Sequence, residues 1–134
     1  MRLVLDASVA VRVVLRLDGA GALIGWLEQA SLVISPALIQ AEVANALWKY
    51  VRAGDLAEAV ALARLDEAMA LIDVKVPDGE LITEALAAAC REGHPVYDLL
   101  YAVLARRHAC AVLTRDGRLT TLLGKLGIPA IGVP

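Results

Sequence analysis

The sequence contains no phenylalanine, and two tryptophans and three tyrosines are its only aromatic residues. With 59% of the residues hydrophobic, the core must therefore be built from leucine, valine, isoleucine and alanine, as is typical of alanine-rich α/β domains. Nowhere do about 18 uncharged apolar residues run together, which excludes a membrane span. Charged residues such as Asp6 and Arg12 interrupt the apolar start, so we expect no signal peptide and a cytoplasmic location.

Cysteine and histidine are equally scarce. Cys90 and Cys110 are expected to be small buried thiols, because two isolated cysteines form no metal or redox motif. A metal-free nuclease would need His94 and His108 as general acid and base, but His94 stands in a turn before a proline and His108 at an expected helix end. A Gly-x-Ser-x-Gly elbow and a phosphate-binding Gly-x-x-x-x-Gly-Lys loop are both missing, which argues against a serine hydrolase and a P-loop nucleotide site.

The formal charge is only −2, with a sequence pI of about 5.6, so the protein as a whole does not attract nucleic acid. Contacts with phosphate would have to come from a local patch. The candidates are Arg12, Arg16, Lys49, Arg52, Arg106, Arg107, Arg115 and Arg118. The mean hydropathy of +0.65 is high for a chain of 134 residues and indicates apolar surface that a second subunit or another partner covers.

Short apolar runs alternate with helical segments along the whole chain. Strands are expected at Leu3–Leu5, Leu32–Ile34, Ile72–Val76, Ala111–Leu113 and Ala130–Val133. Helices are expected from Ser8 to about Ala30 with a break near 18–21, and over Pro36–Arg52, Asp55–Leu71, Glu80–Arg91, Tyr97–Arg107 and a short stretch after Gly117. This alternation predicts one α/β domain over residues 1–134, with a parallel sheet of about five short strands flanked by helices.

Two local signals indicate where helices begin. Ser35 followed by Pro36 has the pattern of an N-cap residue with proline at the first helical position. Asp55, just after Gly54, is expected to cap the next helix.

Two acidic residues follow expected strands directly. Asp6 comes after the first strand and Asp116 shortly after the fourth, and open parallel sheets bind ligands at the edge where their strands end. Each acid also has an ordinary alternative. Asp6 can cap a helix, and Asp116 can belong to a simple Asp-Gly turn.

Two further acids lie on expected helices. Glu42 shares a polar stripe with Asn45, Lys49 and Arg52, which can be merely a solvated helix face. Asp98 stands in the first turn of its helix, where the helix dipole alone favours a carboxylate.

Taken together, these segments resemble a known family. The segments Leu5–Val9, Ser35–Leu47, Tyr97–Tyr101 and Leu113–Leu119 resemble, in this order, the four signature blocks of PIN-domain ribonucleases, especially VapC-type toxins. The resemblance implies a three-layer PIN-like fold. It also implies metal-binding catalytic roles for Asp6, Glu42, Asp98 and Asp116, supporting hydroxyls at Ser8 and Thr114, and a place near the site for Asn45. For the two hydroxyls, helix capping and strand-end bonding are equal alternatives.

The chemistry of four gathered carboxylates agrees with that resemblance. Two carboxylates about 5 Å apart repel by roughly 3 kcal/mol at an effective dielectric of 20, so the group needs either raised pKa values or bound cations. Oxygen ligands without histidine or cysteine select Mg²⁺ or Mn²⁺. Such ions cut RNA by in-line displacement, which predicts products with 5′-phosphate and 3′-hydroxyl ends.

The resemblance implies an RNA substrate, a homodimer, and a small antitoxin whose basic residues lie in the acidic pocket. Two alternatives remain. One is a non-catalytic PIN-fold module that binds RNA or a protein. The other is a receiver-like signalling domain, although such domains usually show adjacent acids after the first strand, and here Ala7 follows Asp6.

Overall fold

The central sheet of the computed structural model, which describes residues 1–132, has five short parallel strands. They are β1 (Arg2–Leu5), β2 (Leu32–Pro36), β3 (Val74–Val76), β4 (Ala111–Leu113) and β5 (Ala130–Ile131). Their order across the sheet is β3-β2-β1-β4-β5, and every neighbouring pair is parallel. The predicted α/β class and strand number are confirmed, while Val133, expected at the end of the last strand, lies outside the described residues.

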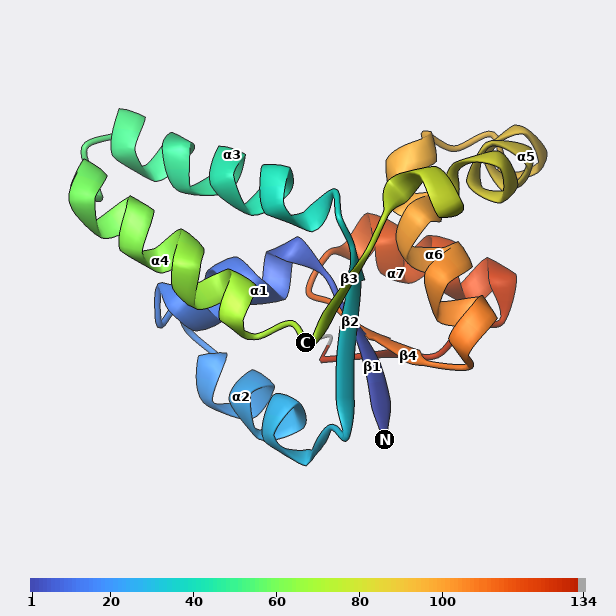
Figure 1. The fold of residues 1–134 in the computed structure, drawn as a ribbon, viewed down its shortest axis with the longest axis horizontal. Coiled ribbons are helices and arrows are strands. Elements are labelled where there is room, and N and C mark those ends of the chain that lie inside the picture. Colours follow the sequence, from blue (N-terminus) through green and yellow to red (C-terminus); the bar gives the residue numbers. More distant parts are fainter. Residues whose placement is uncertain (133–134) are drawn as a thin grey trace.

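Seven helices cover the sheet. They are α1 (Ala7–Val14), α2 (Ala20–Gln29), α3 (Ile39–Arg52), α4 (Glu58–Ala70), α5 (Ile82–Glu92), α6 (Val96–His108) and α7 (Gly117–Leu126), with a 3₁₀ turn at Asp78–Glu80. Helices α1 to α4 lie on one side of the sheet and α5 to α7 on the other, which gives three layers (Figure 1). Within residues 1–132, no helix is long and apolar enough to cross a membrane.

Burial on both faces explains the apolar runs. Leu3, Val4 and Leu5 of β1 have no exposed surface, because helices cover the strand from both sides. Helix α6 is buried over the continuous stretch Leu99–Ala105 and contacts β1, β2 and β4. The central strands and α6 therefore form the core of the domain. The predicted site residues Asp6 and Asp116 lie just beyond the carboxyl ends of β1 and β4.

Both predicted helix starts are wrong. Ser35 and Pro36 belong to β2, and α3 begins only at Ile39. Instead of capping a helix, the fully buried Ser35 hydroxyl donates to the Leu5 carbonyl at 2.7 Å and so ties β2 to β1. Asp55 lies before α4, whose N-cap residue is Ala57 with no side-chain capping bond.

The prediction for the cysteines is half right. Cys110 is buried, as predicted, but Cys90 is exposed. The reason is its place on α5, which turns Ala85, Ala88 and Ala89 toward the core and leaves the next position facing solvent.

Candidate functional site

The site begins where two neighbouring strands end. Leu5 of β1 pairs with Leu113 of β4, and the backbone N–H of Asp6 donates to the Leu113 carbonyl at 3.1 Å. This register brings Asp6 and Thr114 side by side, although 108 positions separate them in the sequence. Parallel pairing thus fixes Asp6 at the carboxyl edge of the sheet, where the sequence placed it.

Asp6 is the most enclosed of the four predicted acids, with 6% of its surface exposed. Two hydroxyls donate to its Oδ2 atom, Ser8 at 2.5 Å and Thr114 at 2.8 Å. Its side chain makes no capping bond to α1, so the helix-cap alternative does not account for it. Burial raises the pKa of Asp6 because the charged form loses hydration, and the hydroxyl donors only partly offset this.

Glu42 points inward from α3 rather than into solvent. Its Oε1 atom accepts a hydrogen bond of 2.5 Å from the hydroxyl of Tyr101, which is almost fully buried in α6. Burial raises the pKa of Glu42, and the negative charges of Asp6, Asp98 and Asp116 raise it further. The simple solvated stripe therefore does not describe this residue.

Sequence reasoning missed Tyr101, although a signal was present. A tyrosine inside an apolar helix needs a partner for its hydroxyl when it is buried. Here that partner is Glu42 of α3, a helix that lies on the other side of the sheet and contacts α1 and α4. Burial, followed by the charges of Asp6 and Glu42, raises the pKa of Tyr101 well above its usual range, so the hydroxyl stays protonated and keeps donating.

A cavity of about 490 Å³ lies between the predicted site residues. Three predicted acids line it, namely Asp6, Glu42 and Asp116, together with the predicted neighbours Ser8 and Asn45. Arg12 and Lys49 also line its wall. An acidic floor with cations at the margin suits a phosphate-bearing ligand that approaches together with a metal ion.

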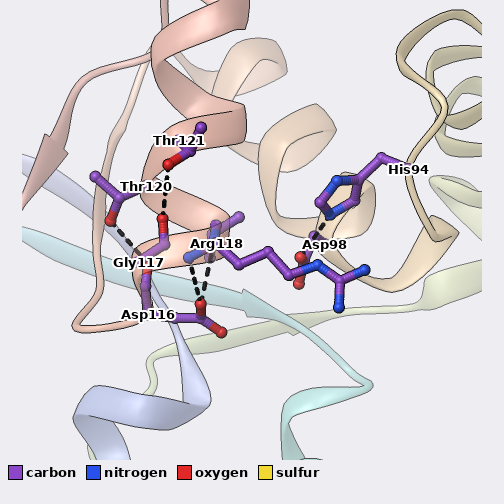
Figure 2. Close-up of polar contacts among 8 residues, drawn as sticks. His94, Asp98, Asp116, Gly117, Arg118, Thr120 and Thr121 are labelled. Carbon is purple, nitrogen blue, oxygen red and sulfur yellow. Dashed lines mark hydrogen bonds and ion pairs between the residues drawn. The ribbon is translucent and has the colours of Figure 1, made fainter.

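Asp116 combines two roles. Its Oδ1 atom caps α7 by accepting from the backbone N–H groups of Arg118 at 2.9 Å and Leu119 at 3.2 Å (Figure 2). Its own N–H donates to the Thr114 hydroxyl at 3.0 Å. The turn considered as its ordinary alternative is therefore real, but it occupies only one carboxylate oxygen and leaves the residue on the cavity wall.

Asp98 stands slightly apart from the other three acids. It lies in the first turn of α6 and does not line the 490 Å³ cavity, yet its charge acts on Glu42. Its Oδ2 atom lies 2.7 Å from His94 Nε2 (Figure 2). Apart from their spacing of four positions, no sequence pattern pairs these two residues.

The donor set fits a hard divalent cation, but the side chains are not gathered around one point. Among residues 1–132, no three His, Cys, Asp or Glu side chains lie close enough together to hold a metal ion as they stand. The hydrogen bonds of Glu42, Asp98 and Asp116 nevertheless engage one carboxylate oxygen of each. Acidic oxygens that burial and mutual repulsion make costly to ionise are a suitable environment for Mg²⁺ or Mn²⁺.

Replacing Glu42 with glutamine is expected to stabilise the metal-free protein at neutral pH. The raised pKa means that Glu42 is best tolerated when protonated, so its contribution is fully present below the ordinary value of 4.5 and is lost as the pH rises through the raised value. Once solvent screening is allowed for, the gain should be about 1 kcal/mol or less. Thermal melts in EDTA at pH 5 and pH 8 measure it. An equal gain at both pH values, or the same gain from the exposed Glu28→Gln, would contradict this explanation.

A comparison with family models matches residues 3–122 to the PIN domain. Among curated proteins, the chain is 33% identical over 138 residues to Ribonuclease VapC3 of Pyrobaculum aerophilum, covering 96% of this chain and 100% of the relative. It is 31% identical over 121 residues to Ribonuclease VapC1 of Mycobacterium tuberculosis, covering 90% of each chain.

Solved structures give the same picture of the fold. The crystal structure of PAE2754 from Pyrobaculum aerophilum aligns with a TM-score of 0.70 at 26% identity, covering 95% of this chain and 90% of the other. VapBC2 from Rickettsia felis, bound to a DNA fragment from its promoter, aligns with a TM-score of 0.64. Its identity is 14%, with coverage of 100% and 98%, so this second likeness concerns the fold alone.

Proposed function

This chain belongs to the PIN domain family, and from that membership we propose that it is a metal-dependent endoribonuclease of the VapC type, built as a single domain over residues 1–134. The observation that supports the proposal best is the cavity at the carboxyl edge of the sheet. Asp6, Glu42 and Asp116 line it, and the charge of Asp98 reaches Glu42. Acids brought together at such an energetic cost suggest a cationic ligand.

In this proposal the four acids hold one or two Mg²⁺ or Mn²⁺ ions. Ser8 and Thr114 fix the Asp6 carboxylate by donating to the same oxygen, and Tyr101 holds one oxygen of Glu42. When bound, the metal would bind the scissile phosphate, lower the pKa of an attacking water and stabilise the leaving 3′ oxygen. The protein's own part is to hold three of the acids, Asp6, Glu42 and Asp116, on the wall of one cavity, with one oxygen of Glu42 and one of Asp116 fixed by hydrogen bonds.

The alternative is a non-catalytic PIN-fold module that binds RNA or a protein. Four acids in the family's order argue against it, because a module that only binds a polyanion gains nothing from buried negative charge. A receiver-like signalling domain is excluded as the family, since the PIN domain matches most of the chain.

The purified chain should cleave mixed cellular RNA in Mg²⁺ or Mn²⁺, lose this activity in EDTA, and regain it when excess metal is restored. Product ends provide an independent readout, because metal-activated water leaves 5′-phosphate and 3′-hydroxyl groups. Cleavage that survives EDTA, or products with 2′,3′-cyclic phosphates, would contradict the metal mechanism. RNA binding without cleavage in any metal would favour the binding module.

We also propose a small antitoxin protein as partner. The supporting feature is an apolar groove of about 260 Å³ between α3 and α4, lined almost entirely by carbon atoms, with Trp48, Leu62 and Leu65 among its residues. Trp48 is 51% exposed and Leu62 is 62% exposed, which is unusual for such large apolar side chains. An amphipathic helix of the partner would suit this groove, and its basic residues would suit the acidic cavity.

The expected homodimer remains a prediction. Ile82 and Leu86 on α5 and Tyr97 on α6 are exposed apolar side chains away from that groove, and they would suit contact with a second copy. Sedimentation equilibrium of the purified chain would read the oligomeric state directly.

A further inference from the structure

A further cavity lies next to the candidate site. It has a volume of about 260 Å³ and is lined by Glu92, His94, Arg118, Thr121, Leu122 and Lys125. Two links connect it with the acids. His94 contacts Asp98 at 2.7 Å, and the Arg118 backbone N–H donates to Asp116 at 2.9 Å. Figure 2 shows the Arg118 side chain extending from α7 toward Asp98 and His94.

One face of α7 forms most of this wall. Arg118, Thr121, Leu122 and Lys125 stand at positions i, i+3, i+4 and i+7 of the helix, so their side chains follow one another along a single face. The Thr121 hydroxyl donates to the Gly117 carbonyl at 3.0 Å and is thus held within the helix. On this face of α7, the charged groups that can reach a ligand are therefore the two cationic side chains.

The charge of the cavity is positive on balance. Arg118 and Lys125 are exposed, and within residues 1–132 neither forms an ion pair with a carboxylate. Glu92 is the one acid on the wall and cannot neutralise two cations. The net charge of −2 suggests no surface that attracts nucleic acid, but these two exposed cations form a local positive patch beside the acidic cavity.

Three of the other expected cations are engaged elsewhere, and two more, Arg12 and Lys49, line the acidic cavity itself. Arg106 and Arg107 both pair with Glu84, at 2.9 and 2.8 Å. Arg52 lies over the Trp48 ring at 4.9 Å. Arg118 is the expected cation that lines the neighbouring cavity, and the fold adds Lys125, which lies two helical turns further along α7.

We infer that Arg118 and Lys125 bind a backbone phosphate of a single RNA strand, next to the bond held over the acids. This inference rests on the proposed nuclease function and adds to it the direction in which the strand leaves the acidic cavity, along α7. A contact with a non-reacting phosphate is made equally in the ground state and the transition state. It therefore lowers KM and leaves kcat nearly unchanged.

The test compares three double variants of the full chain. Arg118→Gln with Lys125→Gln removes both cations, Arg118→Lys with Lys125→Arg keeps them, and Arg2→Gln with Lys75→Gln makes the same charge change outside the cavity. Binding of a fluorescent single-stranded 12-nucleotide RNA is followed by anisotropy in Ca²⁺, and cleavage kinetics are measured in Mn²⁺.

The variant without the two cations should bind about 10- to 100-fold more weakly, with a salt slope smaller by about 0.7, the value for one lost phosphate contact on a single strand. Its KM should rise while kcat stays within about threefold. The charge-keeping and distant variants should bind within about threefold of the parent. If the parent and the variant without the two cations bind RNA equally, the inference is overturned. If that variant binds more weakly but the parent cuts no RNA, the result supports this phosphate site and contradicts the nuclease function.

Discussion

Replacing Asp6 with asparagine is expected to reduce the rate of RNA cleavage by at least about a thousandfold. The substitution keeps the size of the side chain and one oxygen that can accept from Ser8 and Thr114, but it removes the charge that would hold the metal in the proposed site. A thousandfold loss corresponds to about 4 kcal/mol of transition-state stabilisation, a reasonable value for a metal ligand. The rate is measured on labelled RNA in saturating Mn²⁺.

The matched control is Asp66→Asn, which makes the same chemical change on the exposed face of α4. It should cleave at the parent rate. Thermal melts with and without Mn²⁺ distinguish loss of the metal site from loss of the fold. The parent should gain thermal stability when Mn²⁺ is added, because the ion binds only the folded state, and Asp6→Asn should lose that gain while melting cooperatively in EDTA. Activity within tenfold of the parent would remove Asp6 from the proposed site.

Replacing Trp48 with aspartate is expected to weaken the proposed antitoxin complex by about 100-fold or more. Large aromatic side chains at the centre of an apolar groove contribute most to such interfaces, commonly 2 kcal/mol or more each, and a buried carboxylate adds a further penalty. Since half of the Trp48 surface is exposed, the isolated chain should lose less stability than after a comparable change in the core.

The measurement uses the tagged chain recovered from its native host together with whatever protein stays bound to it. The parent should carry a small basic protein that suppresses cleavage, and Trp48→Asp should be recovered without it and be active. Ile24→Asp, a comparable change of an exposed apolar residue on α2, should keep the partner. A bound inhibitor that survives Trp48→Asp would place the interface elsewhere, and an active parent without any small partner would contradict the toxin-antitoxin pair.

The predicted start of α3 was wrong because pairing between strands outweighed the local sequence pattern. The Ser-Pro pattern before α3 has the composition of a helix start, yet Ser35 and Pro36 pair with Lys75 and Val76 of β3. The hydrogen bond from the Ser35 hydroxyl to β1 then satisfies a group that cannot stay unpaired when buried. Capping preferences are weak compared with sheet pairing, so tertiary contacts overrode them.

The sequence by itself determined the architecture and the positions of the candidate acids, because these depend on short-range patterns. Continuous apolar runs mark strands buried on both faces, and Asp6 and Asp116 follow two of them closely, so any parallel arrangement brings these acids to one edge. The order of four such segments was enough to indicate the family, which the comparisons then showed.

Only the tertiary structure decided which groups surround those acids. The family resemblance implied supporting hydroxyls at Ser8 and Thr114, but not that both donate to Asp6. The contact between Glu42 and Tyr101 spans 59 positions, and that between Asp6 and Thr114 spans 108, so no local pattern encodes either pairing. Lys125 was not among the cations selected from the sequence, and it acquires a possible role only because α7 places it beside Arg118 and His94. The physical reason is that charge, burial and pKa depend on distance in space, whereas a sequence pattern reports only the neighbours along the chain.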